Sequence, residues 1–137
     1  MVMAIGVGGF ALSLAGQSTE TFKARLSAMP ADARTRPNLA GSGSVTGVLT
    51  GTKLAITGSF EELLSAATSA SLHSSAAAGV RGAAIGDLTI SKATSGTISG
   101  SIELTPQQLT SLHKGGLYVQ IHSEKAPDGV LWGWFLR

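Results

Sequence analysis

Two histidines are the residues of this sequence with the clearest capacity for chemistry. His73 lies in the predicted strand 69–74, and His122 ends the predicted strand 117–122. Because imidazole is a common metal ligand, the pair could hold copper or zinc, with Asp87 as a further carboxylate. Such sites normally take three or four protein ligands, and the chain has no cysteine. We therefore expect no cofactor and histidines that hydrogen-bond to the main chain or to each other; a copper or zinc site is the alternative.

The other polar side chains show no arrangement typical of catalysis. His113 stands beside Lys114 at the end of a predicted helix, where the helix dipole favours basic residues. No serine lies in a G-x-S-x-G motif. Glu61 and Glu62 are adjacent in the chain, so their side chains cannot act together on one group. The sequence therefore predicts a protein that is not an enzyme.

The aromatic residues are candidates for binding another protein. Two tryptophans fall on the same face of the predicted strand 130–136, where they fill the core or anchor an interface. Tryptophan and tyrosine dominate the energetics of buried interfaces, and two arginines lie in a proline-containing connection that could present them to a partner. The partner-binding candidates are Trp132, Trp134, Tyr118, Arg34 and Arg36.

The composition indicates one β-rich domain. Hydrophobic residues make up 43% of the 137 residues, but only 13% are charged and 18 are glycine, a mixture that favours short strands and turns over long helices. The net charge of +2 comes from basic residues scattered along the chain. Because no basic stripe interleaves with aromatic residues, we expect no nucleic-acid binding.

Alternating apolar residues and turn signals predict about eight strands and one short helix, an all-β antiparallel sandwich. The helix begins after Thr105, a candidate N-cap, with Pro106 at its first position and Gln108 completing a capping box, and it ends at Gly115. The predicted strands are residues 21–26, 41–49, 53–60, 69–74, 83–90, 97–104, 117–122 and 130–136.

Residues 1–16 form an uncharged apolar leader ahead of a domain that comprises residues 17–137. The leader has the length of a signal-peptide core and is shorter than the roughly 18–20 residues that span a bilayer. It is interpreted as a signal peptide, or else as a docking arm that contacts the membrane. Either interpretation predicts a periplasmic, extracellular or envelope protein.

The second half of the chain contains an ordered series of short motifs. A small and threonine-rich approach to a histidine is followed by a G-x-x-G loop, a T-I-S-G-S segment, a tyrosine-bearing strand that ends in histidine, and P-x-G. In this sequence these are residues 66–73, Gly79–Gly82, Thr97–Ser101, residues 115–123 and Pro127–Gly129. The order and spacing of these motifs resemble those of the CHRD (chordin-domain) family, and the match extends over about residues 22–136.

Two positions depart from the family pattern at its histidines. Ser71 stands where the family has the first histidine of H-I-H, and Gln120 stands where the family has asparagine. The resemblance implies a Greek-key sandwich of the immunoglobulin-like or superoxide-dismutase-like kind, in an exported protein. The expected function is a non-catalytic protein-binding module, an accessory subunit of a periplasmic or membrane-associated enzyme complex. The alternative is a copper- or zinc-binding envelope protein.

Overall fold

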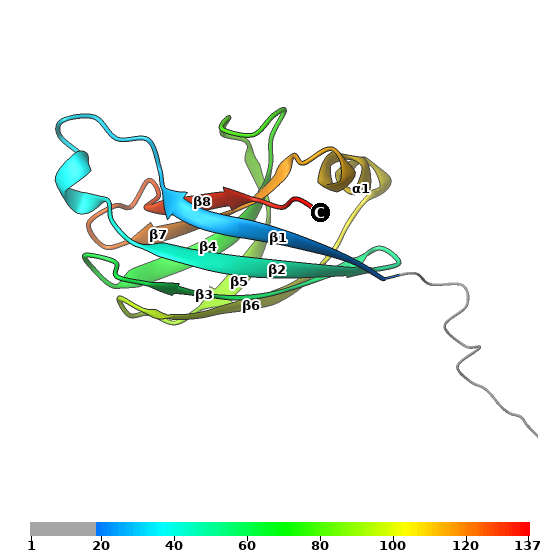
Figure 1. Cartoon of the computed structure of the whole chain (residues 1–137), viewed down its shortest axis with the longest axis horizontal. Helices are drawn as coiled ribbons and strands as arrows, with labels where there is room; N and C mark the ends of the chain where they lie inside the picture. The colour runs from blue at the N-terminus through cyan, green and yellow to red at the C-terminus, as the bar shows by residue number, and fades with distance from the viewer. Residues whose placement is uncertain (1–18) are drawn as a thin grey trace, which may run out of the picture.

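The computed structural model describes residues 19–137 and contains eight β-strands and one α-helix (Figure 1). All eight predicted strands are present, with ends that shift by up to two residues from the predicted ranges. The strands are β1 (Thr19–Ala28), β2 (Ser42–Thr50), β3 (Lys53–Glu61), β4 (Ala67–Ser74), β5 (Ala83–Ile90), β6 (Gly96–Glu103), β7 (Leu117–Ser123) and β8 (Leu131–Trp134). The helix is α1 (Pro106–His113), and a short 3-10 turn covers Arg36–Asn38.

The strands form a closed antiparallel barrel in the order β1-β2-β3-β6-β5-β4-β7-β8. The expectation of an all-β antiparallel fold with one short helix is confirmed, but the Greek-key sandwich is corrected to a barrel. Closure comes from two short pairings. Thr89 and Ile90 of β5 pair with β6, and Ser27 and Ala28 of β1 pair with β8. These pairings join what would otherwise be two separate sheets.

The core fills the interior of the barrel with the inward side chains of every strand. Alternate residues of a strand point to opposite faces, and β1 shows this with Phe22, Ala24 and Leu26 buried between exposed neighbours. Leu72, Val119 and other apolar side chains from the opposite side of the barrel meet them. The largest fully buried side chains of this core are Phe22, Phe135, Leu26, Leu54, Ile56, Leu72, Ile98, Leu112, Leu117, Ile121 and Leu131.

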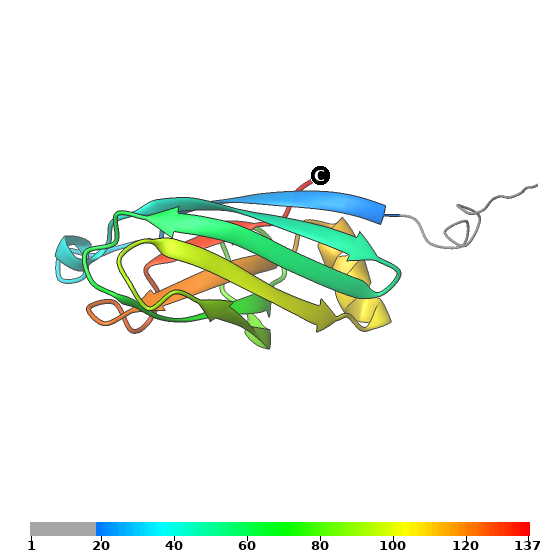
Figure 2. The same ribbon diagram turned by 90° about the horizontal axis from the view of Figure 1, so that it is seen from below.

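Helix α1 lies across one end of the barrel, near the start of β1 and the C-terminus (Figures 1 and 2). The predicted capping box is present: the Gln108 main-chain N–H donates to Thr105 Oγ1 at 3.2 Å, and the Thr105 N–H donates to Gln108 Oε1 at 3.0 Å. His113 Nε2 contacts Glu20 Oε1 at 2.7 Å and so ties the helix to β1. The sequence signal of this helix therefore specified its start correctly.

The predicted leader, residues 1–16, lies outside the described residues 19–137. Within the described part of the chain, no helix has the length and apolar character needed to span a membrane.

Candidate functional site

The predicted histidine and aromatic site residues gather on the outer side of β4, β7 and β8. The neighbours of these residues along each strand, such as Leu72, Val119 and Leu131, point into the core, so the alternating residues point outward. We name this surface the histidine–aromatic face. It consists of Ser71, His73, Tyr118, Gln120, His122, Trp132 and Trp134.

Strand register arranges this face in rows. In the first row, Tyr118 pairs with His73 of β4 on one side and with Trp134 of β8 on the other. The rings stack along this row, with centroids 4.9 Å apart for His73 and Tyr118 and 4.4 Å apart for Tyr118 and Trp134. Cross-strand aromatic pairs of this kind stabilise a sheet. The second row contains Ser71, Gln120 and Trp132.

The loop between β4 and β5 covers part of the histidine–aromatic face. The Gly82 N–H donates to the Tyr118 hydroxyl at 2.8 Å, and that hydroxyl donates to the Gly82 carbonyl at 3.3 Å. The Trp134 Nε1–H donates to Ser75 Oγ at 3.1 Å. Tyr118 is fully buried and Trp132 is 8% exposed, packed with Met29, whereas Trp134 is half-buried. The aromatic candidates thus form a second apolar cluster outside the barrel.

Both nitrogens of the His73 ring are engaged within the chain. Nδ1 lies 2.9 Å from the Gly82 carbonyl oxygen, which can only accept a hydrogen bond, so Nδ1 carries the proton. In the neutral ring Nε2 then accepts from Ser71 Oγ at 2.8 Å. The imidazole therefore links β4 to the loop that covers the face.

His122 is held in the same manner at the other end of the face. Its Nδ1–H donates to the Pro127 carbonyl at 2.8 Å, and its Nε2 accepts from Gln120 Nε2 at 3.3 Å. Gln120 Nε2 also donates to the Asp128 carbonyl at 3.3 Å. Gln120 is 3% exposed, and its Oε1 has no hydrogen-bond partner among the described residues.

The two histidines do not form a metal centre of the usual kind. His73 pairs with Tyr118, but His122 pairs with Ser69, four residues earlier on β4. At about 3.3 Å per residue, this offset places the two backbones roughly 13 Å apart along the strand. No group of three or more His, Cys, Asp or Glu residues that could hold a metal occurs within residues 19–137. The residues present therefore do not fit a three- or four-ligand copper or zinc site.

Arg34 and Arg36 lie apart from the histidine–aromatic face, in the exposed connection between β1 and β2. This connection is ordered by Asp32, whose carboxylate accepts from the main-chain N–H groups of Thr35 and Arg34, both at 2.9 Å. These hydrogen bonds lower the pKa of Asp32 below its usual 3.8, and the one from Thr35 has the largest effect. A hollow of about 220 Å³ beside the connection is lined by Arg81 and Lys125 among others, but not by Arg34 or Arg36.

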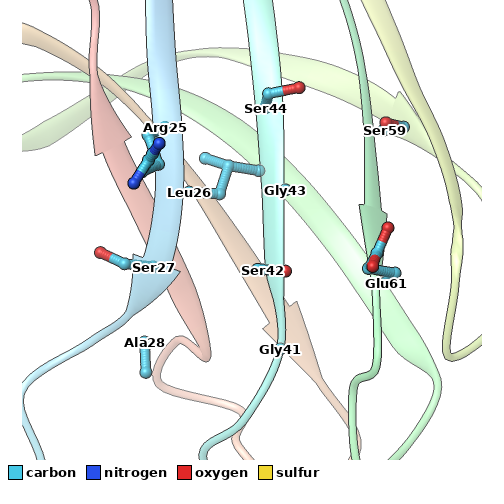
Figure 3. A pocket seen from close by; sticks show the side chains of 10 residues that line it. All are labelled: Arg25, Leu26, Ser27, Ala28, Gly41, Ser42, Gly43, Ser44, Ser59 and Glu61. Carbon is cyan, nitrogen blue, oxygen red and sulfur yellow. The ribbon is translucent and has the colours of Figure 1, made fainter.

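A larger groove, of about 610 Å³, opens on the outer side of β1, β2 and β3, and sequence reasoning did not find it (Figure 3). We name it the divergence groove because it lies where β1 and β2 separate. The Gly-Ser run at residues 41–44 was the available signal, since small residues leave the main chain accessible. Its lining residues are Arg25, Leu26, Ser27, Ala28, Gly41, Ser42, Gly43, Ser44, Ser59 and Glu61.

The divergence groove and the histidine–aromatic face are neighbours around the barrel. Ser27, which lines the groove, pairs directly with Trp132 across β1 and β8. One continuous outer surface therefore runs from Trp134 through Trp132 to the groove.

The family comparison agrees with the resemblance in the sequence. The model of the CHRD domain matches residues 22–133, which include all eight strands in whole or in part. No curated protein and no solved structure matches the chain.

Proposed function

The chain belongs to the CHRD family, and from this premise we propose that it is a non-catalytic protein-binding module, an accessory subunit of a larger envelope complex. The divergence groove carries the proposal. Its walls are main chain, serine hydroxyls and the charges of Arg25 and Glu61, neither of which forms an ion pair within the described chain. Such walls offer hydrogen bonds and charge. Ser42 is paired with Glu61, but within residues 19–137 no hydrogen bond joins a serine hydroxyl of the groove to a carboxylate or an imidazole that could activate it, so the walls suit recognition rather than turnover.

The histidine–aromatic face supports the same proposal by its hydrogen bonds. Catalytic imidazole must exchange a proton with a substrate, but each ring nitrogen of His73 and His122 is engaged with a group of the chain itself. These histidines fasten the covering loops to the sheet. The face therefore gives the module a rigid outer surface next to the groove.

We place this module in the periplasm or another part of the cell envelope, or outside the cell. The proposal rests on the apolar leader at residues 1–16 and is compatible with a chain free of cysteine. The leader, as a docking arm, would also bring the barrel to a membrane. Cell fractionation with N-terminal sequencing of the recovered chain tests the location, and recovery of the intact chain from the cytosolic fraction alone would contradict it.

Capture of a partner tests the binding function. The full chain, tagged at its C-terminus, is expressed in its source cells, cross-linked in place and purified, and its partners are identified by mass spectrometry. We expect one envelope or membrane-associated protein at near-stoichiometric amount. A chain that purifies only as an uncross-linked monomer would count against the module.

A matched pair of substitutions assigns the capture to the groove. Ser44 and Thr46 are neighbouring outward positions on β2, but only Ser44 lines the groove. Tyrosine is well accepted on strands, so both variants should fold. We expect S44Y to lose the partner and T46Y to retain it.

A copper- or zinc-binding envelope protein is the alternative function. The observation that favours it is that Nε2 of His73 and Nε2 of His122 each contact one member of the paired residues Ser71 and Gln120. Metal binding would have to break both contacts and recruit further ligands. Elemental analysis of protein purified from the envelope decides this alternative, which requires stoichiometric copper or zinc.

A further inference from the structure

The divergence groove exists because β1 changes its hydrogen-bonding partner. From Thr19 to Leu26, β1 pairs with β2, and at Ser27 and Ala28 it pairs with β8 on its other edge. The last β1–β2 pair is Leu26 with Gly43, so the strands separate beyond this point. Odd-numbered residues of β1, such as Lys23 and Met29, direct their main-chain groups toward β8, and Ser42 pairs with Glu61 of β3. Of the residues beyond the last β1–β2 pair, Ala28 and Gly41 therefore direct main-chain groups into the groove with no strand partner.

Free main-chain edges on two sides are a template for an added strand. Main-chain N–H and C=O groups require hydrogen-bond partners, and strand addition supplies them from an extended peptide. The side chains that β2 directs into the groove are those of Ser42 and Ser44, whose small size leaves room for a peptide above them, whereas Gly43 between them faces the interior. A Cβ on Gly43 would run into the Ser59 carbonyl oxygen, and the buried side chain of Leu26 lies just beneath, 3.1 Å from that position.

The charges at the groove select the peptide. Arg25 on β1 and Glu61 on β3 stand on either side, with Ser42 and Ser44 between them (Figure 3). Arg25 is level with Ser44, and Glu61 is level with Ser42, two residues further along the strand direction. An extended segment parallel to the strands advances about 3.3 Å per residue, so its residues i and i+2 lie level with the two charges.

We propose that the divergence groove binds an extended segment of a partner protein, with an acidic residue level with Arg25 and a basic residue two positions away level with Glu61. This inference rests on the proposed binding function and names its ligand. No aromatic side chain lines the groove, and a sugar ring would have no surface on which to stack. A peptide is therefore favoured over a carbohydrate.

Nuclear magnetic resonance titration of the isotopically labelled full chain tests the proposal. The probes are the capped pentapeptides Thr-Asp-Val-Lys-Thr and Thr-Lys-Val-Asp-Thr, which present both directions of charge. We expect one of them to shift the amide signals of Ser27, Ala28 and Ser42. The same peptide N-methylated at its central valine should bind at least about tenfold more weakly, because it loses a main-chain donor.

Charge exchange gives the decisive control. In the double variant R25E/E61R the preferred pentapeptide should switch to the other order. The proposal is overturned if neither peptide shifts these amides at millimolar concentration, if N-methylation has no effect, or if a hexasaccharide probe shifts them instead. Equal capture of the cellular partner by S44Y and T46Y would overturn the groove proposal but leave the binding function intact. If S44Y, T46Y and the unaltered chain all fail to capture a partner, the binding function itself is overturned.

Discussion

The ring of Tyr118 stacks on the ring of Trp134, with 4.4 Å between their centroids, and the two residues are also directly paired across β7 and β8. Stacking and register therefore reinforce each other at this position. Because His73 extends the same row on β4, three strands are held in one alignment by side chains on the outside of the barrel. The outer face is thus a structural element in its own right, independent of the core.

The hydroxyl of Tyr118 should contribute measurably to stability. Substitution Y118F keeps the stacked ring but leaves the main-chain N–H of Gly82 without its partner at 2.8 Å. We expect the free energy of unfolding to fall by about 1–2 kcal/mol, measured by chemical denaturation. Ser69, exposed on the neighbouring strand, provides the control S69A, which should change it little. Equal stability of Y118F and the unaltered chain would contradict this role.

Gly133 should be essential for the closure of the barrel. A Cβ on Gly133 would meet the main-chain oxygen of Arg25, so β8 could not approach β1. We expect G133A to cost about 1–3 kcal/mol, as strained overpacking does. Gly100 is the control, because its Cβ would press against the flexible end of Leu88, at 2.6 Å, and would come no closer than 3.6 Å to any main-chain atom. Thermal unfolding compares the two variants, and a larger loss in G100A than in G133A would refute the explanation.

The β1–β2 connection should lose order in acid. The pKa of Asp32 is lowered below 3.8 by the hydrogen bonds from Thr35 and Arg34, so the stabilisation is complete above pH 3.8 and is lost as the pH falls through the folded-state pKa. We expect the amides of Thr35 and Arg34 to exchange faster with solvent as the pH is lowered through this range, after correction for intrinsic rates. In D32N this pH dependence should disappear. An unchanged profile in D32N would assign it to another group.

A single substitution should create metal binding on the histidine–aromatic face. Position 71 lies two residues from His73 on the same face of β4. It is directly opposite Gln120 of β7, which is two residues from His122 on the same face. We expect S71H to bind zinc or copper with three imidazoles, and the unaltered chain to bind neither stoichiometrically, as measured by calorimetry. The double variant S71H/H73A should lose this binding. Binding to S71H no tighter than to the unaltered chain would show that the three positions do not converge.

The elements of this fold were predictable because their signals are local. The strand at Ala83–Ile90 has the predicted bounds, and the capping residues of α1 were identified from the sequence. The strand at Leu131–Trp134 is shorter than predicted, because Phe135 and Leu136 leave the ladder and only Leu136 still makes a bridge, to Lys23. Boundaries depend on neighbouring strands, which a sequence window does not contain.

The candidate site was predictable only in part. The histidines and aromatic residues were singled out by type, and the structure places His73, Tyr118 and Trp134 in one row. Their hydrogen-bond partners were not predictable, because Gly82 and Pro127 contribute main-chain oxygens that any residue could offer. The divergence groove was missed for the same reason, since its recognition surface is largely main chain.

Local sequence patterns are sufficient to specify which side chains of each strand face inward, where the helix begins, and that the chain follows the CHRD pattern. Alternation, capping and motif order are all encoded by residues close together in the chain. The closure of the sheet into a barrel and the groove beside that closure depend instead on contacts between distant parts of the chain. Both depend on Ser27 pairing with Trp132, which lies more than one hundred residues away in the sequence. The alternation of apolar and polar residues within a strand specifies which of its faces is buried. The main-chain edges of a strand are the same in every strand, so the packing of the whole chain decides which strands pair.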